Sequence, residues 1–238
     1  MSRQRVWDLP TRLFHWALAG GIVAAVVTGK IGGDLIEWHG RSGLFILGLV
    51  IFRIVWGFVG SPTARFANFI RGPRAIKAYL KGEWQGIGHN PLGALAVLAL
   101  LTLTAAQVFS GLFANDDITF QGPLAGLLSK EASDQSRGLH SLVFYGLLGI
   151  VGLHLAAIAF YTRVKKESLL KPMLTGWKAS DPVLAKAAPV EHHHSPLRSA
   201  IAFTVAALIA STTVYAASGG LLPAEPPPPP AAVAAPAW

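Results

Sequence analysis

Residues 139–154 read LHSLVFYGLLGIVGLH, and this stretch of one long apolar block is the strongest indication of the fold. It carries two histidines, His140 and His154, 14 positions apart. In an α-helix, 14 residues make almost four full turns, so both side chains project from nearly the same face, roughly 21 Å apart along the axis. The spacing predicts a helix that presents one imidazole at each of two depths.

The apolar residues of the whole chain are concentrated in long blocks. Hydrophobic residues make up 52% of the 238 positions and charged residues only 13%, a balance typical of membrane proteins. A cleaved signal peptide is an alternative for the first block, but no small-residue cleavage site closes it and further blocks follow. We expect an all-α membrane protein, a four-helix transmembrane bundle plus a fifth C-terminal transmembrane helix, with spans at Leu13–Gly33, Trp38–Gly60, Pro91–Ala114, Leu139–Thr162 and Ser199–Leu222.

The basic residues predict the orientation of these spans. The N-terminal arm, the loop 61–88 and the loop 163–198 hold 15 of the 20 Lys and Arg residues. Because cytoplasmic loops carry the excess of basic residues, we expect a cytoplasmic N-terminus and a periplasmic C-terminus in a bacterial inner membrane. The net charge of +8 is then a topology signal, and no nucleic-acid recognition element accompanies it.

The sequence divides into four parts. Residues 1–178 form the bundle, with a short interfacial helix expected at Pro73–Leu80. Residues 179–198 read as a polar cytoplasmic linker whose histidines, His192–His194, are interpreted as solvated. Residues 199–222 are the fifth span. Residues 223–238 are a proline-rich periplasmic tail, PAEPPPPPAAVAAPAW, expected to act as a polyproline spacer.

Two further histidines supply a partner at each depth. His15 begins the first span at the inside surface, level with His154, and His39 begins the second span at the outside surface, level with His140. Facing histidines from two helices, at two heights of a four-helix bundle, predict two bis-imidazole metal sites.

Haem is the cofactor that such sites favour. Gly29, 14 positions after His15, and Gly43, one turn after His39, would give the outer ring room. The absence of cysteine excludes covalent c-type attachment, and the two methionines, Met1 and Met173, lie outside the spans. We therefore expect two non-covalent haem b groups with bis-histidine ligation, which leaves no open position for oxygen or substrate.

Other readings of the histidines are weaker. A proton relay is the sharpest alternative, but such relays usually include buried carboxylates, and no Asp or Glu falls in the middle of a span. Zinc would be left with half of its tetrahedral ligands missing. A single intramembrane histidine is also often only a hydrogen-bonded packing residue.

The sequence leaves the roles of Arg53 and His89 open. Arg53 lies 14 residues after His39, on the same helix face, and is either a snorkelling side chain or a partner for a haem propionate at the inner site. His89 in GIGHNPLG could compete with His15 as partner of His154. Since it precedes a proline in a turn, we favour a structural role or a propionate contact.

Several long stretches resemble the prokaryotic di-haem cytochrome b family, which includes cytochromes b-561 and the b-type subunit of nickel–iron hydrogenases. They are RVWDLPTRLFHW, WHGRSGLFILGLVIFRIVWGFVG, ARFANFIRGPRAIKAYL, GHNPLGA and LHSLVFYGLLGIVGLHLAAIAFY, followed by KKESLLKPMLTG. The resemblance covers about Arg5–Lys178. It implies an inner haem between His15 and His154, an outer haem between His39 and His140, and electron transfer between a periplasmic redox partner and membrane quinone.

Three functions follow from these observations. The leading one is a membrane electron-transfer subunit that links a periplasmic partner, such as a c-type cytochrome, a dehydrogenase or a hydrogenase, to the quinone pool. The second is a stand-alone quinone oxidoreductase acting on a small diffusible donor such as superoxide. The third is a haem-free membrane anchor or transporter.

Overall fold

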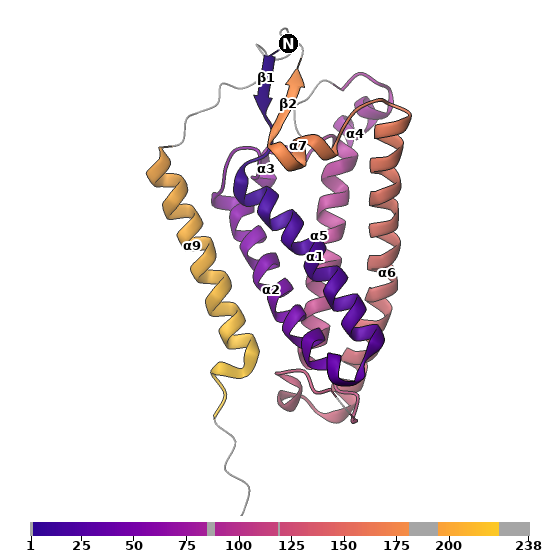
Figure 1. Ribbon diagram of the computed structural model, residues 1–238, viewed down its shortest axis with the longest axis vertical. Coiled ribbons are helices and arrows are strands. Elements are labelled where there is room, and N and C mark those ends of the chain that lie inside the picture. The colour runs from indigo at the N-terminus through magenta and orange to yellow at the C-terminus, as the bar shows by residue number, and fades with distance from the viewer. Residues whose placement is uncertain (1, 85–88, 119, 181–194, 224–238) are drawn as a thin grey trace, which may run out of the picture.

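Five long helices run side by side in the computed structural model (Figure 1), which describes residues 2–84, 89–118, 120–180 and 195–223. They are α1 (Leu9–Ile31), α2 (Ile36–Val59), α5 (Pro91–Phe113), α6 (Lys130–Arg163) and α9 (Pro196–Tyr215). Each is long and apolar enough to cross a membrane. The prediction of an all-helical chain with five spans is confirmed.

Short elements connect and cover the long helices. They are β1 (Ser2–Arg5), η1 (Gly33–Leu35), α3 (Phe66–Phe69), α4 (Pro73–Leu80), η2 (Ala125–Leu127), α7 (Leu170–Thr175), β2 (Trp177–Ser180) and η3 (Ala216–Gly220). The helix expected at Pro73–Leu80 is present with these bounds. The linker 181–194, with His192–His194, and the tail from residue 224 lie outside the described residues.

Capping side chains explain why two helices begin earlier than the apolar blocks. Asp8 accepts a hydrogen bond from the backbone N–H of Thr11 at 2.7 Å, so α1 begins at Leu9 rather than Leu13. Ser129 caps α6 in the same way, through the N–H of Ala132 at 3.4 Å. The first turns of α6 are polar and therefore lie outside any hydropathy block.

Helix α2 is the centre of the bundle. It packs against α1, α5 and α9, and α5 in turn packs against α6. The buried core joins α2 to α5 and to the end of α9, through Ile46, Leu47, Val50, Leu101, Val108, Leu112 and Ala217. In the described part of the chain α1 and α6 share little backbone contact, and the rings of His15 and His154 face each other across this side of the bundle.

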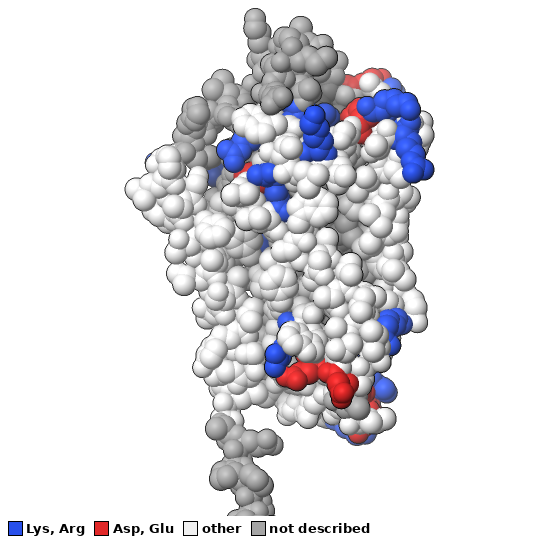
Figure 2. Space-filling view, viewed as in Figure 1, with Lys and Arg blue, Asp and Glu red and all other residues white. Residues whose placement is uncertain are grey.

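The two ends of the bundle differ, and we name them by what they carry. The cap end, at the top of Figure 1, carries β1, β2, α4 and α7, and the loop end carries residues 32–35 and 114–129. On the face seen in Figure 2, Lys and Arg gather at the cap end, both signs of charge mix at the loop end, and a white uncharged surface separates them. Such a belt is what a bilayer requires.

A small sheet at the cap end was not expected from the sequence. β1 pairs antiparallel with β2, with Ser2 opposite Ser180 and Arg5 opposite Trp177. Beside it, Trp16 donates its indole N–H to the carbonyl of Met173 at 3.4 Å, and Arg12 donates to the carbonyl of Leu174. The chain after α6 is thereby fastened over the start of α1.

The fifth helix lies along α2. Its Phe203 meets Phe52 and Trp56 edge to face, with ring centres 5.5 and 6.3 Å apart, and Ala206 is completely buried. Near the loop end, Val214 comes so close to Gly48 that a Cβ there would lie 3.1 Å from it. Small residues thus let α2 and α9 approach closely.

Candidate cofactor site

The structure brings the four predicted histidines together as two facing pairs. At the cap end the ring centres of His15 (α1) and His154 (α6) lie 6.5 Å apart, with their planes at 54°. At the loop end the ring centres of His39 (α2) and His140 (α6) lie 6.0 Å apart, with their planes at 85°. Helix α6 contributes one ring to each pair, as the 14-residue spacing predicts.

These separations suit one metal ion between each pair of rings. A metal–imidazole bond is about 2.0 Å long and the ring centre lies roughly 1.2 Å behind the bonded nitrogen, so two imidazoles on opposite sides of one metal have ring centres about 6.4 Å apart. Within the described ranges no third His, Asp or Glu joins either pair to make a metal cluster. The donor set is two imidazoles at each level, which fits the axial ligation of a haem iron.

Backbone carbonyls fix both rings of the loop-end pair. Nδ1 of His39 lies 2.8 Å from the carbonyl oxygen of Ala25, and Nδ1 of His140 lies 2.8 Å from that of Gln107. Each Nδ1 therefore carries the proton and donates it to the carbonyl. Nε2 is left unprotonated, which is the form that binds a metal.

Two glycines give these rings their space. A Cβ on Gly29 would lie 2.6 Å from Nδ1 of His39, and one on Gly111 would lie 3.0 Å from Cε1 of His140. Gly29, expected to give the outer ring room, lies in the structure against the imidazole of His39. A Cβ on Gly43 would meet nothing within 4 Å, so that position is open.

Helix α5 carries no histidine, yet it contributes a side chain to the loop-end pair that the sequence did not indicate. The side-chain amide nitrogen of Gln107 lies 3.0 Å from Nε2 of His140, while its Oε1 is buried without a hydrogen-bond partner in the described chain. For His140 to bind a metal through Nε2, this amide has to turn aside. Gln107 is the one amide side chain in α5, where the other polar residues are two threonines and a serine, and this amide was the available signal.

Arg53 is buried at the cap end of α2 with hydrogen-bonding capacity to spare. The residue is 3% exposed, its guanidinium lies 4.9 Å from the ring centre of Phe66, and Nη1 has no partner among the described residues. The neighbouring carboxylate of Asp8 is already occupied by the indole of Trp56, at 3.0 Å, and by the hydroxyl of Ser61. A buried cation in this state favours an anionic ligand.

His89 has aromatic neighbours instead of a histidine partner. Its ring centre lies 4.5 Å from that of Trp7 and 4.4 Å from that of Phe69. Burial and, secondarily, the positive charge of Arg53 lower the pKa of His89 to about 4. The ring is therefore neutral near pH 7, and its buried Nδ1 has no partner in the described structure.

Comparison with known proteins identifies the family. The profile described as prokaryotic cytochrome b561 matches residues 6–176. The chain is 28% identical over 211 residues to a probable Ni/Fe-hydrogenase B-type cytochrome subunit of Azotobacter chroococcum mcd 1, covering 73% of this chain and 87% of the relative. A protein of the same description from Azotobacter vinelandii is 27% identical over 216 residues, with the same coverage of both chains.

A third similar protein, also described as a probable Ni/Fe-hydrogenase B-type cytochrome subunit, comes from Bradyrhizobium diazoefficiens. It is 26% identical over 209 residues, which covers 72% of this chain and 84% of the relative. No solved structure matches the chain significantly. The matched profile spans all four histidines of the two pairs. The chain belongs to the prokaryotic cytochrome b561 family of membrane electron carriers, a family that implies haem b.

Proposed function

We propose that this protein holds two haem b groups and carries electrons across the membrane between them. His15 and His154 would ligate the cap-end haem, and His39 and His140 the loop-end haem. The observation that carries the proposal is the pair of ring separations, 6.5 and 6.0 Å, each close to what an iron between two imidazoles needs.

The chain's own residues would determine what these haems do. Each haem supplies a one-electron couple of iron(II) and iron(III), and two histidines per iron leave no position for oxygen or a substrate. The carbonyls of Ala25 and Gln107 would hold the loop-end imidazoles in the metal-binding form. Arg53 would neutralise a propionate at the cap end, and Gly43 would leave space beside the loop-end group.

The proposed orientation follows from the charges. The cap end, with most of the Lys and Arg residues, would face the cytoplasm of a bacterial cell, and the loop end would face the periplasm. Electrons would then pass between a periplasmic redox protein and membrane quinone. The relatives described as hydrogenase subunits favour a hydrogenase-type partner, although a c-type cytochrome or another dehydrogenase would meet the same requirement.

The test is a measurement on purified protein in mild detergent. Two haems per chain, a low-spin spectrum in both oxidation states and poor binding of carbon monoxide are expected, because two histidines would hold each iron. Co-purification from native membranes should identify the redox partner. A chain that incorporates no haem, or one that binds carbon monoxide stoichiometrically, would overturn the proposal.

A further inference from the structure

A groove lies between α2 and α9 where the two helices meet at the cap end. Its volume is about 270 Å³, and it is lined by Val59 of α2 and by Arg198, Ile201, Ala202 and Val205 of α9. Val59 is the last residue of α2, and Arg198 lies in the first turn of α9. The groove therefore begins at the charged cap end and extends toward the uncharged belt.

The lining carries a single charge, and this charge lies at one end. The four lining residues of α9 are spaced by three, four and seven positions from Arg198, so they share one face of the helix. From Arg198 to Val205 this face extends roughly 10 Å along the helix axis. A cation at one end of an apolar groove is complementary to an amphiphile with an anionic head and a hydrocarbon chain.

The floor of the groove is fixed by packing. Ala202 lies against the buried cluster of Trp56, Ala64 and Ala206, and Ala206 is completely buried. Beside it, Phe203 meets Trp56 edge to face, with ring centres 6.3 Å apart. These contacts hold α9 against α2, and the small side chain of Ala202 leaves the space above it open.

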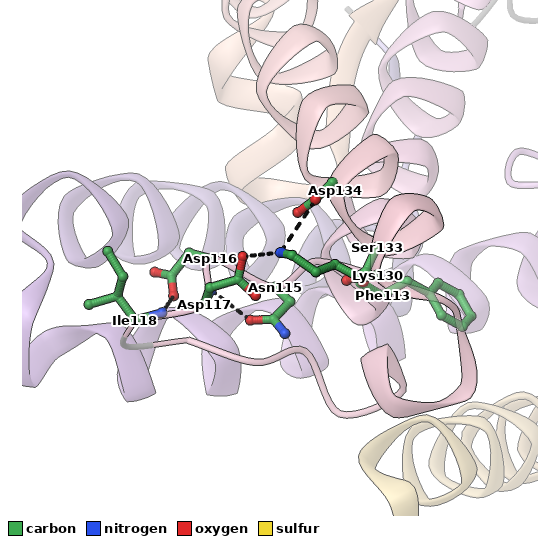
Figure 3. Close-up of polar contacts among 8 residues, drawn as sticks. All are labelled: Phe113, Asn115, Asp116, Asp117, Ile118, Lys130, Ser133 and Asp134. Atoms are coloured by element: carbon green, nitrogen blue, oxygen red, sulfur yellow. Dashed lines mark hydrogen bonds and ion pairs between the residues drawn. The ribbon is translucent and has the colours of Figure 1, made fainter.

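Arg198 is a cation without a counter-charge. At the loop end, Lys130 pairs with Asp117 and, at 3.5 Å, with Asp134 (Figure 3). Arg198 is exposed and forms no ion pair or hydrogen bond with any residue that the structure describes. A guanidinium in this state at the boundary of the membrane attracts the phosphate of a lipid.

A second guanidinium lies at the same end of α2. Nε of Arg65 donates a hydrogen bond of 2.8 Å to the carbonyl of Gly60, the residue that follows Val59. The positive potential around the head of the groove is therefore not that of one side chain alone. A zwitterionic lipid would bring its own cation into this potential, so the charges favour a lipid with a net negative head.

We propose that the groove binds one anionic phospholipid of the cap-end leaflet, with its phosphate at Arg198 and one acyl chain along Ile201, Ala202 and Val205. The bound lipid would brace α9 against α2. The inference goes beyond the proposed function, since it involves neither haem pair nor the path of the electrons. Helix α9 also lies outside residues 6–176, the part of the chain that the family profile matches.

Two substitutions in the groove and two matched controls test the proposal. Arg198→Gln removes the cation, and Arg163→Gln removes an exposed arginine of α6, also at the cap end but outside the lining. Val205→Asn places a polar group in the groove, and Leu208→Asn does so at an exposed position of α9 outside it. Native mass spectrometry of the full chain in mild detergent measures binding of phosphatidylglycerol and of phosphatidylcholine with identical acyl chains.

The wild type should bind the first phosphatidylglycerol about fivefold more tightly than phosphatidylcholine. Arg198→Gln should lose this preference and Arg163→Gln should keep it. Val205→Asn should weaken the binding of both lipids about fivefold, because it removes apolar surface from the acyl chain, and Leu208→Asn should weaken neither.

Two results would overturn the inference. If the wild type binds both lipids equally, or if Arg198→Gln and Arg163→Gln lose the same preference, Arg198 only adds to the general charge of the cap end. If the chain is instead a dimer that Arg198→Gln and Val205→Asn dissociate, a second copy of the chain occupies the groove.

Discussion

At the loop end, backbone carbonyls from α1 and α5 hold the two imidazoles, and Gly29 and Gly111 make room for them. At the cap end, Nδ1 of His15 is buried without a partner in the described chain. The two histidine pairs are therefore held differently by the residues around them. The loop-end rings are already held in the tautomer that binds a metal, although the Gln107 amide still has to leave Nε2 of His140. The cap-end pair still has a ring to orient, and this difference should appear in haem affinity.

The largest expected effects come from the ligands themselves. His39→Ala and His140→Ala should each remove the loop-end haem, and His15→Ala and His154→Ala the cap-end haem, so that the ratio of haem to protein falls from about two to about one. The remaining haem should keep its low-spin spectrum, because the pairs are roughly four helical turns apart. The assay is haem absorbance against protein concentration. If His15→Ala keeps both haems and His89→Ala loses one, the cap-end pairing is wrong.

Glycine-to-alanine substitutions should affect haem binding at the loop end and leave it unchanged at the cap end. Gly29→Ala and Gly111→Ala each drive a methyl group into a loop-end imidazole, so the loop-end haem should be lost or weakened while the cap-end haem stays. Gly20→Ala is the matched control in α1, since a Cβ there meets nothing within 4 Å. It should keep both haems and stabilise the helix slightly, by up to about 1 kcal/mol. Equal haem loss at both ends in Gly29→Ala would mean that the substitution acts through the whole bundle.

Much of this arrangement was accessible from the sequence, and the rest was not, for physical reasons. Apolar blocks and the 14-residue spacing report on a single helix, so the spans and the depths of the four histidines could be predicted from them. Gly111 and Gln107 act on His140 only because α5 packs beside α6, and no local pattern encodes that neighbourhood. The β1–β2 pairing joins residues 2–5 to residues 177–180. These strands are only four residues long and lie far apart in the chain, so no local pattern predicts that they pair.

A smaller effect is expected on the midpoint potential of the cap-end haem. Arg53→Gln removes a buried positive charge, which favours the oxidised, more positive state of a nearby haem and lowers its midpoint potential. A shift of about 60 mV would correspond to a tenfold change in a one-electron equilibrium. Redox titration should show this shift in the cap-end haem alone, and Arg137→Gln at an exposed site should leave both potentials in place. A shift confined to the loop-end haem would remove Arg53 from the cap-end site.

The smallest effect expected is a pH dependence that belongs to the cap end. His89 has a pKa of about 4 in the folded protein, below the value of about 6.5 for an unfolded chain. Between these two values the unfolded state binds more protons than the folded state, so stability is full above about pH 6.5 and declines as the pH falls toward 4. His89→Gln, which cannot take up a proton, should lose less thermal stability than the wild type between pH 7 and pH 5. The measurement is the unfolding temperature at each pH, with His39 and His140 unchanged and the loop-end haem spectrum as an internal reference. If both proteins lose the same number of degrees, protonation of His89 does not limit the stability of the cap end in acid.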